Sequence, residues 1–343
     1  MRAVFFLLPI LLSLPLATGY AQLRHWQSEQ HSVPLDTTLS PTPKPADKPW
    51  KLCALYPSLK DSYWLSVNFG MLEAARRYAV ALKIMEASGY NQLHTQQEQI
   101  AQCRQWGADA LIVGSSTAQL PQLKTWAGPL PVIELVNATH NPHIATRVGV
   151  PWYQMGYLPG HYLAQQAKGK GKPMNVLLMP GPRDAGGSNE MLTGFKQALA
   201  GSQLHIVDIA YGDNDTEVQR NLLQDMLERY PNIDIVAGTA IAAEVAMGEN
   251  LRRAKPLEIV SFYLSHQVYR GLKRDKIAVS ASDQMVWQGE LAIEQAVRVL
   301  QHLPVSDNIS PPLLLLTPHN IHHNEITRSL SPLGFRPVYS YQP

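Results

Sequence analysis

Short apolar runs alternate with longer amphipathic stretches along most of the chain. The run KLCALY at 51–56 is followed by a stretch at 62–78 whose apolar residues recur with helical spacing. This alternation predicts strands joined by helices, and therefore parallel sheets covered on both faces. The strands are expected at 51–56, 82–86, 110–114, 132–135, 145–148, 175–179, 205–210, 233–237, 258–261 and 278–281, and the helices at 62–78, 96–106, 153–166, 188–199, 217–230 and 286–302.

The number of these strands fits two sheets better than one closed barrel. A chain of 343 residues is also longer than one hydrophobic core usually serves. We therefore predict an α/β protein with two doubly wound parallel-sheet lobes. In open sheets of this kind ligands bind beyond the carboxyl ends of the strands, so two facing sheets form a cleft lined by the strand exits.

The chain begins with a positive residue, an apolar stretch and a small-residue site, in MRAVFFLLPILLSLPLATGYAQ. This order is typical of a secretory signal peptide, expected at 1–21 with cleavage after about Ala21. A membrane anchor is the alternative, but the apolar stretch is shorter than the roughly 20 residues that a span needs. Residues 22–49 are polar and contain several prolines, which predicts an extended arm before the folded body.

Composition narrows the classes of partner. Hydrophobic residues make up 45% of the chain and charged residues 16%, as in ordinary soluble proteins. The formal net charge is +2, and the sequence shows no basic stripe interleaved with aromatic residues. Nucleic acid is therefore not an expected partner.

The whole chain contains two cysteines, Cys53 and Cys103. Cys53 lies on the first expected strand, and Cys103 lies late in the second expected helix. In an exported protein such a pair favours one disulfide, and two buried free thiols are the alternative. Two cysteines alone are poor evidence for a metal site.

Signatures of catalysis are missing from the sequence. It has no G-x-S-x-G elbow, no H-E-x-x-H helix and no Walker lysine. The glycine-rich MPGPRDAGGS suits either an anion at a helix start or a flexible turn, and the histidines of PHNIHHNE have no cysteine nearby. We therefore expect no enzyme, no cofactor and no metal.

Aromatic and acidic residues gather where the expected strands end. The residues of this set are Asp61, Tyr63, Trp64, Trp152, Tyr263 and Asp283. Core packing explains each ring alone. Together, the rings and the two carboxylates predict a cage for a cation, because aromatic faces attract quaternary ammonium groups.

Several segments carry a resemblance to a known family. WKLCALYPSLKDSYWLS, VGVPWYQMGY, NVLLMPGPRDAGGS and ASDQMVWQGELA resemble segments of the type I periplasmic binding proteins, and the similarity to the ribose-binding kind spans residues 50–318. The resemblance implies a periplasmic protein whose two lobes are joined by crossing strands. The lobes are then expected at 50–145 plus 284–318 and at 146–283, with a C-terminal tail at 319–343.

A comparison with the sugar-binding members sharpens the expected site. Where those members sandwich a sugar between two phenylalanines, this sequence has Tyr63 and Trp64. Where they grip sugar hydroxyls with arginine, it has Asn137 and Asn189. Buried hydroxyls need matched hydrogen-bond partners, so this exchange favours a small methylated cation or amine oxide over a sugar.

Within the family, the segments resemble those of members that sense trimethylamine N-oxide. The resemblance implies that the cage binds this compound and that the protein relays its presence to the periplasmic sensor domain of a histidine kinase, which controls genes of anaerobic respiration on it. The donor to the N-oxide oxygen stays open between a protonated acid, a tyrosine hydroxyl and an indole N–H. A receptor that delivers a sugar, amine or betaine to an ABC permease is the alternative, and an exported enzyme is a more distant one.

Overall fold

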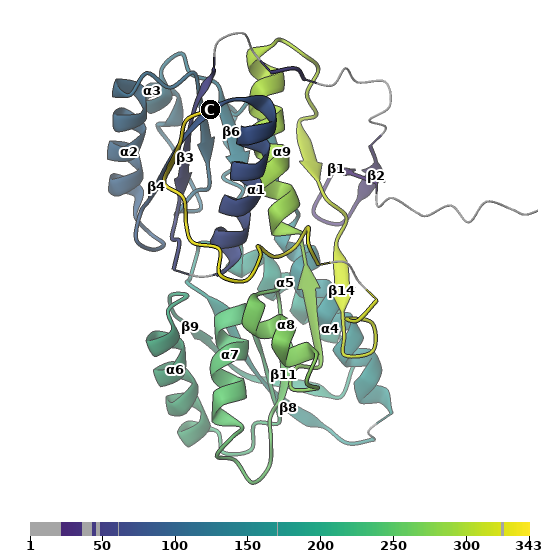
Figure 1. Cartoon of the computed structure of the whole chain (residues 1–343). Helices are drawn as coiled ribbons and strands as arrows, with labels where there is room; N and C mark the ends of the chain where they lie inside the picture. The colour runs from purple at the N-terminus through teal and green to yellow at the C-terminus, as the bar shows by residue number, and fades with distance from the viewer. Residues whose placement is uncertain (1–21, 36–42, 46–48, 61, 170, 324–325) are drawn as a thin grey trace, which may run out of the picture.

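The computed structural model describes residues 22–35, 43–45, 49–60, 62–169, 171–323 and 326–343. It shows two lobes, one above the other in Figure 1, each built on one β-sheet with helices packed against it. The expected signal peptide at 1–21 lies outside the described residues. None of the helices described is long and apolar enough to cross a membrane.

The first sheet is parallel in its centre and antiparallel at both edges. Its strand order is β15-β4-β3-β5-β6-β7-β13-β1-β2. Neighbours from β4 to β13 pair in parallel, whereas β15, β1 and β2 pair antiparallel. The strands are β1 Arg24–Trp26, β2 Ser32–Pro34, β3 Lys51–Tyr56, β4 Ala81–Glu86, β5 Ala110–Val113, β6 Val132–Leu135, β7 Thr146–Val148, β13 Asn308–Ser310 and β15 Ser340–Tyr341, and the helices of this lobe are α1 Ser62–Tyr78, α2 Leu93–Gln105, α3 Leu123–Ala127 and α9 Met285–Leu300.

The second sheet has the order β14-β12-β11-β10-β8-β9. All its neighbours pair in parallel except β14, which runs antiparallel to β12. Its strands are β8 Met174–Gly181, β9 Leu204–Tyr211, β10 Ile235–Gly238, β11 Glu258–Ser261, β12 Val279–Ser282 and β14 Leu314–Leu316, and the helices of this lobe are α4 Trp152–Lys168, α5 Ser188–Leu199, α6 Thr216–Arg229, α7 Ala240–Glu249 and α8 His266–Leu272. The two parallel sheets with helices confirm the predicted fold class.

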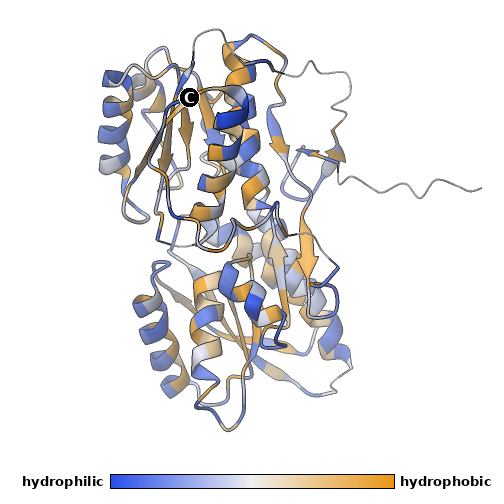
Figure 2. Ribbon diagram, viewed as in Figure 1, coloured by the Kyte–Doolittle hydropathy of each residue, from blue (hydrophilic) through white to orange (hydrophobic). Residues whose placement is uncertain are grey.

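Burial on both faces explains why the longer strands are visible in the sequence. In β3, every residue from Leu52 to Tyr56 is buried, and Figure 2 shows hydrophobic strands inside both lobes with polar faces on the outer helices. Parallel strands covered in this way form continuous apolar runs. The predicted strands and helices lie within three residues of the observed ends.

The shortest strands are not predicted from the sequence. β1, β2, β13, β14 and β15 have only two or three residues each, too few to show an alternation of apolar and polar positions. Three of them, β1, β2 and β15, lie in the segments expected as an arm and a tail. These segments are therefore partly built into the first sheet.

The N-terminal hairpin, residues 24–34, joins the first sheet through the pairing of β1 with β13. Trp26, next to its turn, is buried and donates from Nε1 to Oγ of Ser310 at 2.5 Å. Its turn carries Glu29 toward the boundary between the lobes. The extended arm expected here thus contains a folded piece that reaches the centre of the molecule.

The chain crosses between the sheets after β7, β12 and β13, as the resemblance implies. After β14 the tail turns back to the first lobe along the lobe boundary, the yellow trace in Figure 1. The backbone N–H of Ser331 donates to Ser66 in α1 at 3.2 Å, and the carbonyl oxygen of Ser331 lies 2.8 Å from Nε2 of His266 in α8. The exact lobe boundaries stay a prediction. β7, at the start of the range expected as the second lobe, pairs in the first sheet, and β14, near the end of the range expected as the first lobe, pairs in the second sheet.

One close helix pair packs in each lobe. A Cβ added to Gly289 of α9 would lie 2.2 Å from the carbonyl oxygen of Val67 in α1. A Cβ added to Gly156 of α4 would lie 1.9 Å from the carbonyl oxygen of Met191 in α5. Since no side chain fits at either crossing, glycine sets the spacing of the helices that carry the site.

A disulfide joins Cys53 of β3 to Cys103 of α2, with an S–S distance of 2.03 Å. It links an inner strand of the first sheet to a helix of the same lobe. The predicted pairing is confirmed.

Candidate functional site

The ends of four elements meet between the lobes. Tyr63 and Trp64 lie in the first turn of α1, and Trp152 is the first residue of α4. Tyr263 lies two residues beyond β11, and Asp283 directly follows β12. The fold thus brings together side chains that are far apart in the sequence, at the strand exits where the cleft was expected.

Four aromatic rings form a contact cluster, called the ring cluster below. The ring centroid of Tyr63 lies 5.8 Å from that of Trp64, 6.3 Å from that of Trp152 and 5.4 Å from that of Tyr263. The rings of Trp152 and Tyr263 are 6.4 Å apart with their planes at 73°. All four residues are buried. Asp61, the other predicted residue of this wall, lies outside the described residues.

Glycines make room for two of these rings. A Cβ added to Gly114, after β5, would lie 2.4 Å from the ring of Trp64. A Cβ added to Gly187, before α5, would lie 2.1 Å from the ring of Trp152, and the backbone of Gly187 has a φ of +73°. The glycine-rich stretch MPGPRDAGGS, for which the sequence left an anion site or a flexible turn open, therefore packs against an aromatic ring.

Tyr90 belongs to this region but is missing from the predicted residues. The distance from Nε1 of Trp64 to the hydroxyl of Tyr90 is 3.5 Å, and a Cβ added to Gly186 would lie 2.9 Å from the ring of Tyr90. Tyr90 follows β4, so it is also an aromatic residue at a strand exit. Applied to every strand, the criterion that found the other rings would have found it.

Asp283 is the buried acid of the site. Its Oδ2 accepts hydrogen bonds from the hydroxyl of Tyr63 at 2.5 Å and from Nε2 of Gln288 at 2.7 Å. Its Oδ1 is buried and has no hydrogen-bond partner among the described residues. Burial raises the pKa of Asp283, although both hydrogen bonds oppose the shift. Burial, and then the charge of Asp283, hold the pKa of Tyr63 well above its usual range.

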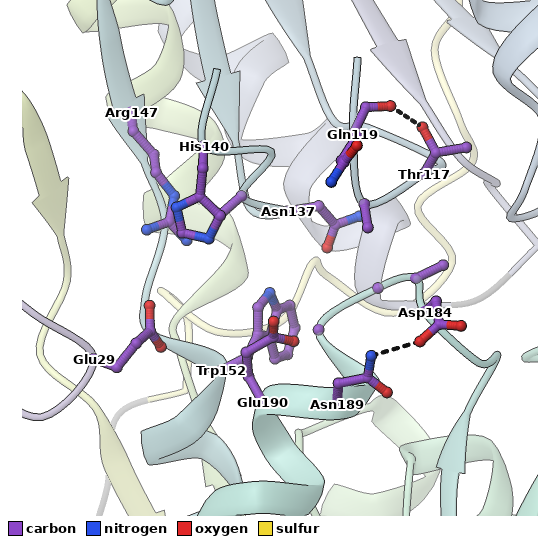
Figure 3. Close-up of a pocket in the computed structure, with 15 residues that line it drawn as sticks. Glu29, Thr117, Gln119, Asn137, His140, Arg147, Trp152, Asp184, Asn189 and Glu190 are labelled. Carbon is purple, nitrogen blue, oxygen red and sulfur yellow. Dashed lines mark hydrogen bonds between the residues drawn. The ribbon is translucent and has the colours of Figure 1, made fainter. Parts of the chain in front are cut away.

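A polar cavity adjoins the ring cluster and shares Trp152 with it (Figure 3). Asn137 and Gln119 line it from the first lobe, and Asp184, Asn189 and Glu190 line it from the second lobe. Its volume is about 220 Å³. The two asparagines that replace sugar-gripping residues in the family comparison therefore face this cavity, not the centre of the ring cluster.

The ring cluster has the residue types of the predicted cation cage, and its role in binding stays a prediction. The planes of Trp152 and Tyr263 meet at 73°, and aromatic faces of this kind attract methylated nitrogen groups. Among the described residues, no group of three or more His, Cys, Asp and Glu side chains is placed to hold a metal ion.

Comparison with known proteins agrees with this architecture. The family model of periplasmic binding proteins and the sugar-binding domain of the LacI family matches residues 49–337. The periplasmic protein TorT of Escherichia coli strain K12 is 63% identical over 342 residues, which cover 100% of this chain and 98% of TorT. The chain is thus a homologue of TorT along its whole length.

Solved structures give the same result. A complex of the TorS sensor domain with TorT, in the presence of trimethylamine N-oxide, contains a chain that is 41% identical, with a TM-score of 0.78 and coverage of 84% of this chain and 99% of that one. An ABC transporter solute-binding protein from Bradyrhizobium sp. BTAi1 with bound Bis-Tris is 34% identical, with a TM-score of 0.77 and coverage of 94% and 99%. The resemblance found in the sequence is confirmed, and this chain belongs to the family of periplasmic binding proteins and LacI-type sugar-binding domains.

Proposed function

We propose that this protein binds trimethylamine N-oxide in the periplasm and relays its presence to the sensor domain of a histidine kinase of the TorS kind. The observation that carries the proposal is the 63% identity to TorT along the whole chain. A TorT protein has been solved with the TorS sensor domain in the presence of trimethylamine N-oxide. The protein acts in this proposal as a binding protein, without a reaction of its own.

The ring cluster is the proposed place of the methylated nitrogen. Trp152 and Tyr263 are 6.4 Å apart, so one nitrogen can lie within about 6 Å of both centroids, the range of cation–π attraction. A desolvated contact of this kind contributes about 2 kcal/mol or more. The buried rings also match the three methyl groups of the ligand.

Asp283 is the residue that we assign to the oxygen of the N-oxide. The hydroxyl of Tyr63 already donates to Oδ2, whereas Oδ1 has no partner among the described residues. Burial raises the pKa of Asp283, which favours a proton on this acid. A protonated carboxyl donates a hydrogen bond to a negative oxygen, so the acid is the preferred donor among those that the sequence left open.

In this proposal, contacts across the lobe boundary carry the effect of ligand binding to the kinase sensor domain. The backbone N–H of His266 in the second lobe donates to Oγ of Ser62 in the first lobe at 3.3 Å. Tyr90 of the first lobe packs against Gly186 of the second. A ligand between the lobes shifts their equilibrium by its differential affinity for the closed state, and a sensor domain that contacts both lobes can read that shift.

Isothermal titration of the mature protein with trimethylamine N-oxide, alone and with the TorS sensor domain, tests the proposal. We expect saturable binding, and Trp64→Ala or Trp152→Ala should weaken it more than Asn189→Ala. No heat in either experiment would show that the ligand is wrongly assigned. The opposite order of the variants would show that the cage is wrongly placed.

A receptor for an ABC permease is the second candidate. The 34% identity to an ABC transporter solute-binding protein favours it. The two functions share one fold and differ in the partner. Purification of the protein with a permease, and not with a kinase sensor domain, would decide for transport.

A further inference from the structure

The polar cavity beside Trp152 is built by three separate parts of the chain. Glu29 comes from the N-terminal hairpin, Asn137 and Arg147 from the first lobe, and Glu190 from the second lobe. The volume of about 220 Å³ is far above the roughly 10–15 Å³ that one ordered water needs. The cavity therefore has room for a solute of several non-hydrogen atoms.

Two buried polar atoms on its wall lack partners. Among the described residues, Nε1 of Trp152 has no hydrogen-bond acceptor and Oδ1 of Asn137 has no donor. Trp152 is 6% exposed and Asn137 is 4% exposed, and Figure 3 shows both side chains at the cavity. The amide nitrogen of Asn137 donates to the carbonyl oxygen of Ser115 at 2.8 Å, which fixes the carboxamide in this orientation. One donor and one acceptor on the wall of the same cavity match a hydroxyl group, which both accepts and donates.

Carboxylates dominate the charge of the wall. Glu29, Asp184 and Glu190 all line the cavity. Oε2 of Glu29 is buried and has no partner among the described residues. Burial raises the pKa of Glu29, although the charge of Arg147 and a hydrogen bond from the backbone N–H of Tyr153 oppose the shift. The wall therefore offers a carboxylate oxygen to a donor that is not part of the protein.

The positive groups do not balance these carboxylates. Nε of Arg147 lies 3.5 Å from Oε2 of Glu134, and the NH2 group of Arg147 lies 3.3 Å from the carbonyl oxygen of Val150. Arg147 thus contacts the first lobe, but its Nε has no hydrogen-bond partner among the described residues and its charge also acts on Glu29 and Glu190. One guanidinium therefore faces three carboxyl groups around the cavity. His140 also lines the cavity. An anion would meet more repulsion than attraction here, whereas a cation would meet the reverse.

We propose that this cavity is a second binding site, for a small ammonium ion that carries hydroxyl groups. The ammonium group meets Glu29 and Glu190, and a hydroxyl group meets Nε1 of Trp152 and Oδ1 of Asn137. The N-terminal hairpin completes the site, since it alone supplies Glu29. The proposal does not depend on whether the ring cluster binds trimethylamine N-oxide.

Titration with protonated tris(hydroxymethyl)aminomethane at neutral pH, in phosphate buffer, tests the site on the mature protein. Two matched probes separate the contributions, glycerol with hydroxyls and no charge, and tetramethylammonium with charge and no hydroxyls. All three titrations are made with trimethylamine N-oxide in excess. We expect saturable binding of the first probe and at least roughly tenfold weaker binding of each of the other two. No binding of the first probe, or equal binding of glycerol, would overturn the proposal.

Glu29→Gln locates the site, because glutamine keeps the size of the side chain and removes its charge. We expect it to weaken the hydroxylated ammonium probe roughly tenfold or more, with an unchanged melting temperature. Glu98→Gln is the matched control, since the side chain of Glu98 is 61% exposed on α2, away from the cavity. Equal affinity of Glu29→Gln and Glu98→Gln for the probe would place binding elsewhere and overturn the proposal.

The affinity of Glu29→Gln for trimethylamine N-oxide separates this site from the ring cluster. We expect that affinity to stay within about twofold of the unchanged protein, and Asp283→Asn to show the reverse pattern, with the hydroxylated ammonium probe still bound. Loss of both ligands in Glu29→Gln would show one shared site and overturn the proposal. Failure of trimethylamine N-oxide to bind the unchanged protein would count against the proposed function alone.

Discussion

The ring cluster and the polar cavity share Trp152 but are built in opposite ways. The ring cluster buries aromatic faces against one another, and such burial stabilises a fold by roughly 25 cal/mol per Å². The cavity keeps buried polar atoms without partners among the described residues, and each such atom costs about 1–3 kcal/mol. Stability alone explains the packed rings, but not the unsatisfied atoms of the cavity or Oδ1 of Asp283 beside the rings. The unsatisfied polar atoms are therefore the stronger sign of a ligand, and the rings need a binding experiment to distinguish a cage from a core.

Trp64→Ala tests the stabilising side of this comparison and has the largest expected effect. Trp64 is 1% exposed, so its truncation should lower the free energy of unfolding by about 3–5 kcal/mol in urea denaturation. The same variant should lose binding of trimethylamine N-oxide in titration. Trp126→Ala on α3 is the control, since Trp126 is only partly buried and should lose clearly less. Equal losses for the two variants would mean that the ring cluster is not a tightly packed core.

Gly187→Ala tests whether the loop before α5 holds the shared ring in place. The added Cβ would lie 2.1 Å from the ring of Trp152, and we expect a loss of about 1–3 kcal/mol from overpacking, together with weaker binding in both regions. Gly201→Ala is the matched control, because Gly201 has the same φ of +73° and no atom within 4 Å of the added Cβ. The difference between the two melting temperatures measures the ring contact without the backbone strain. No difference would contradict the packing described here.

Asp283→Asn separates binding from stability within the ring cluster. Because burial raises the pKa of Asp283 in the folded protein, the folded state holds the proton more tightly than the unfolded state. Its contribution to stability is therefore fully present below the usual pKa of an aspartate and is lost as the pH rises through the raised value. The asparagine variant should lack this fall, so the ligand-free protein should gain stability at neutral pH while its affinity for trimethylamine N-oxide falls roughly tenfold.

Urea denaturation at several pH values, from acidic to neutral, checks this prediction. Asp225→Asn on the exposed face of α6 is the control, and its profile should follow that of the unchanged protein. A profile for Asp283→Asn that falls with pH as steeply as that of the unchanged protein would contradict the assigned role of burial.

Trp152→Phe makes the smallest and most selective change. Phenylalanine keeps an aromatic face toward the ring cluster and removes the N–H that lines the cavity. We expect the affinity for trimethylamine N-oxide to stay within about threefold, and the affinity for the hydroxylated ammonium probe to fall roughly fivefold. Titration with both ligands measures the two effects in one protein. The reverse pattern would show that the indole N–H serves the N-oxide oxygen instead of Asp283.

The ring cluster could be predicted from the sequence because its residues follow strands of a parallel sheet. β3 is a buried, mostly apolar run, β11 is a shorter one, and the fold brings the exits of such strands together, so Tyr63 and Tyr263 could be placed in one cleft. The roles of these side chains in binding stay a prediction. Tyr90 lies four residues beyond the end of β4, so it has the same sequence signal as the other rings, at a greater distance from its strand.

The polar cavity could not be found in this way. Glu29 lies on a hairpin whose strands have three residues each and whose partner strand, β13, begins at Asn308. No local pattern specifies a pairing between such distant and such short segments. The contacts of Arg147 could not be predicted from the sequence either. In the structure its guanidinium lies near Glu134 and backbone carbonyl oxygens.

The end of the tail has a consequence for handling this protein. β15 runs antiparallel to β4, with Tyr341 opposite Leu82, and the carbonyl oxygen of Tyr339 accepts from the backbone N–H of Ile84 at 2.8 Å. A chain cut before this segment would present the outer row of β4 amides and carbonyls to solvent, and an unpaired edge of that kind is a template for another chain. The last few residues therefore cover the edge of the first sheet, and an affinity tag is better placed away from this end of the chain.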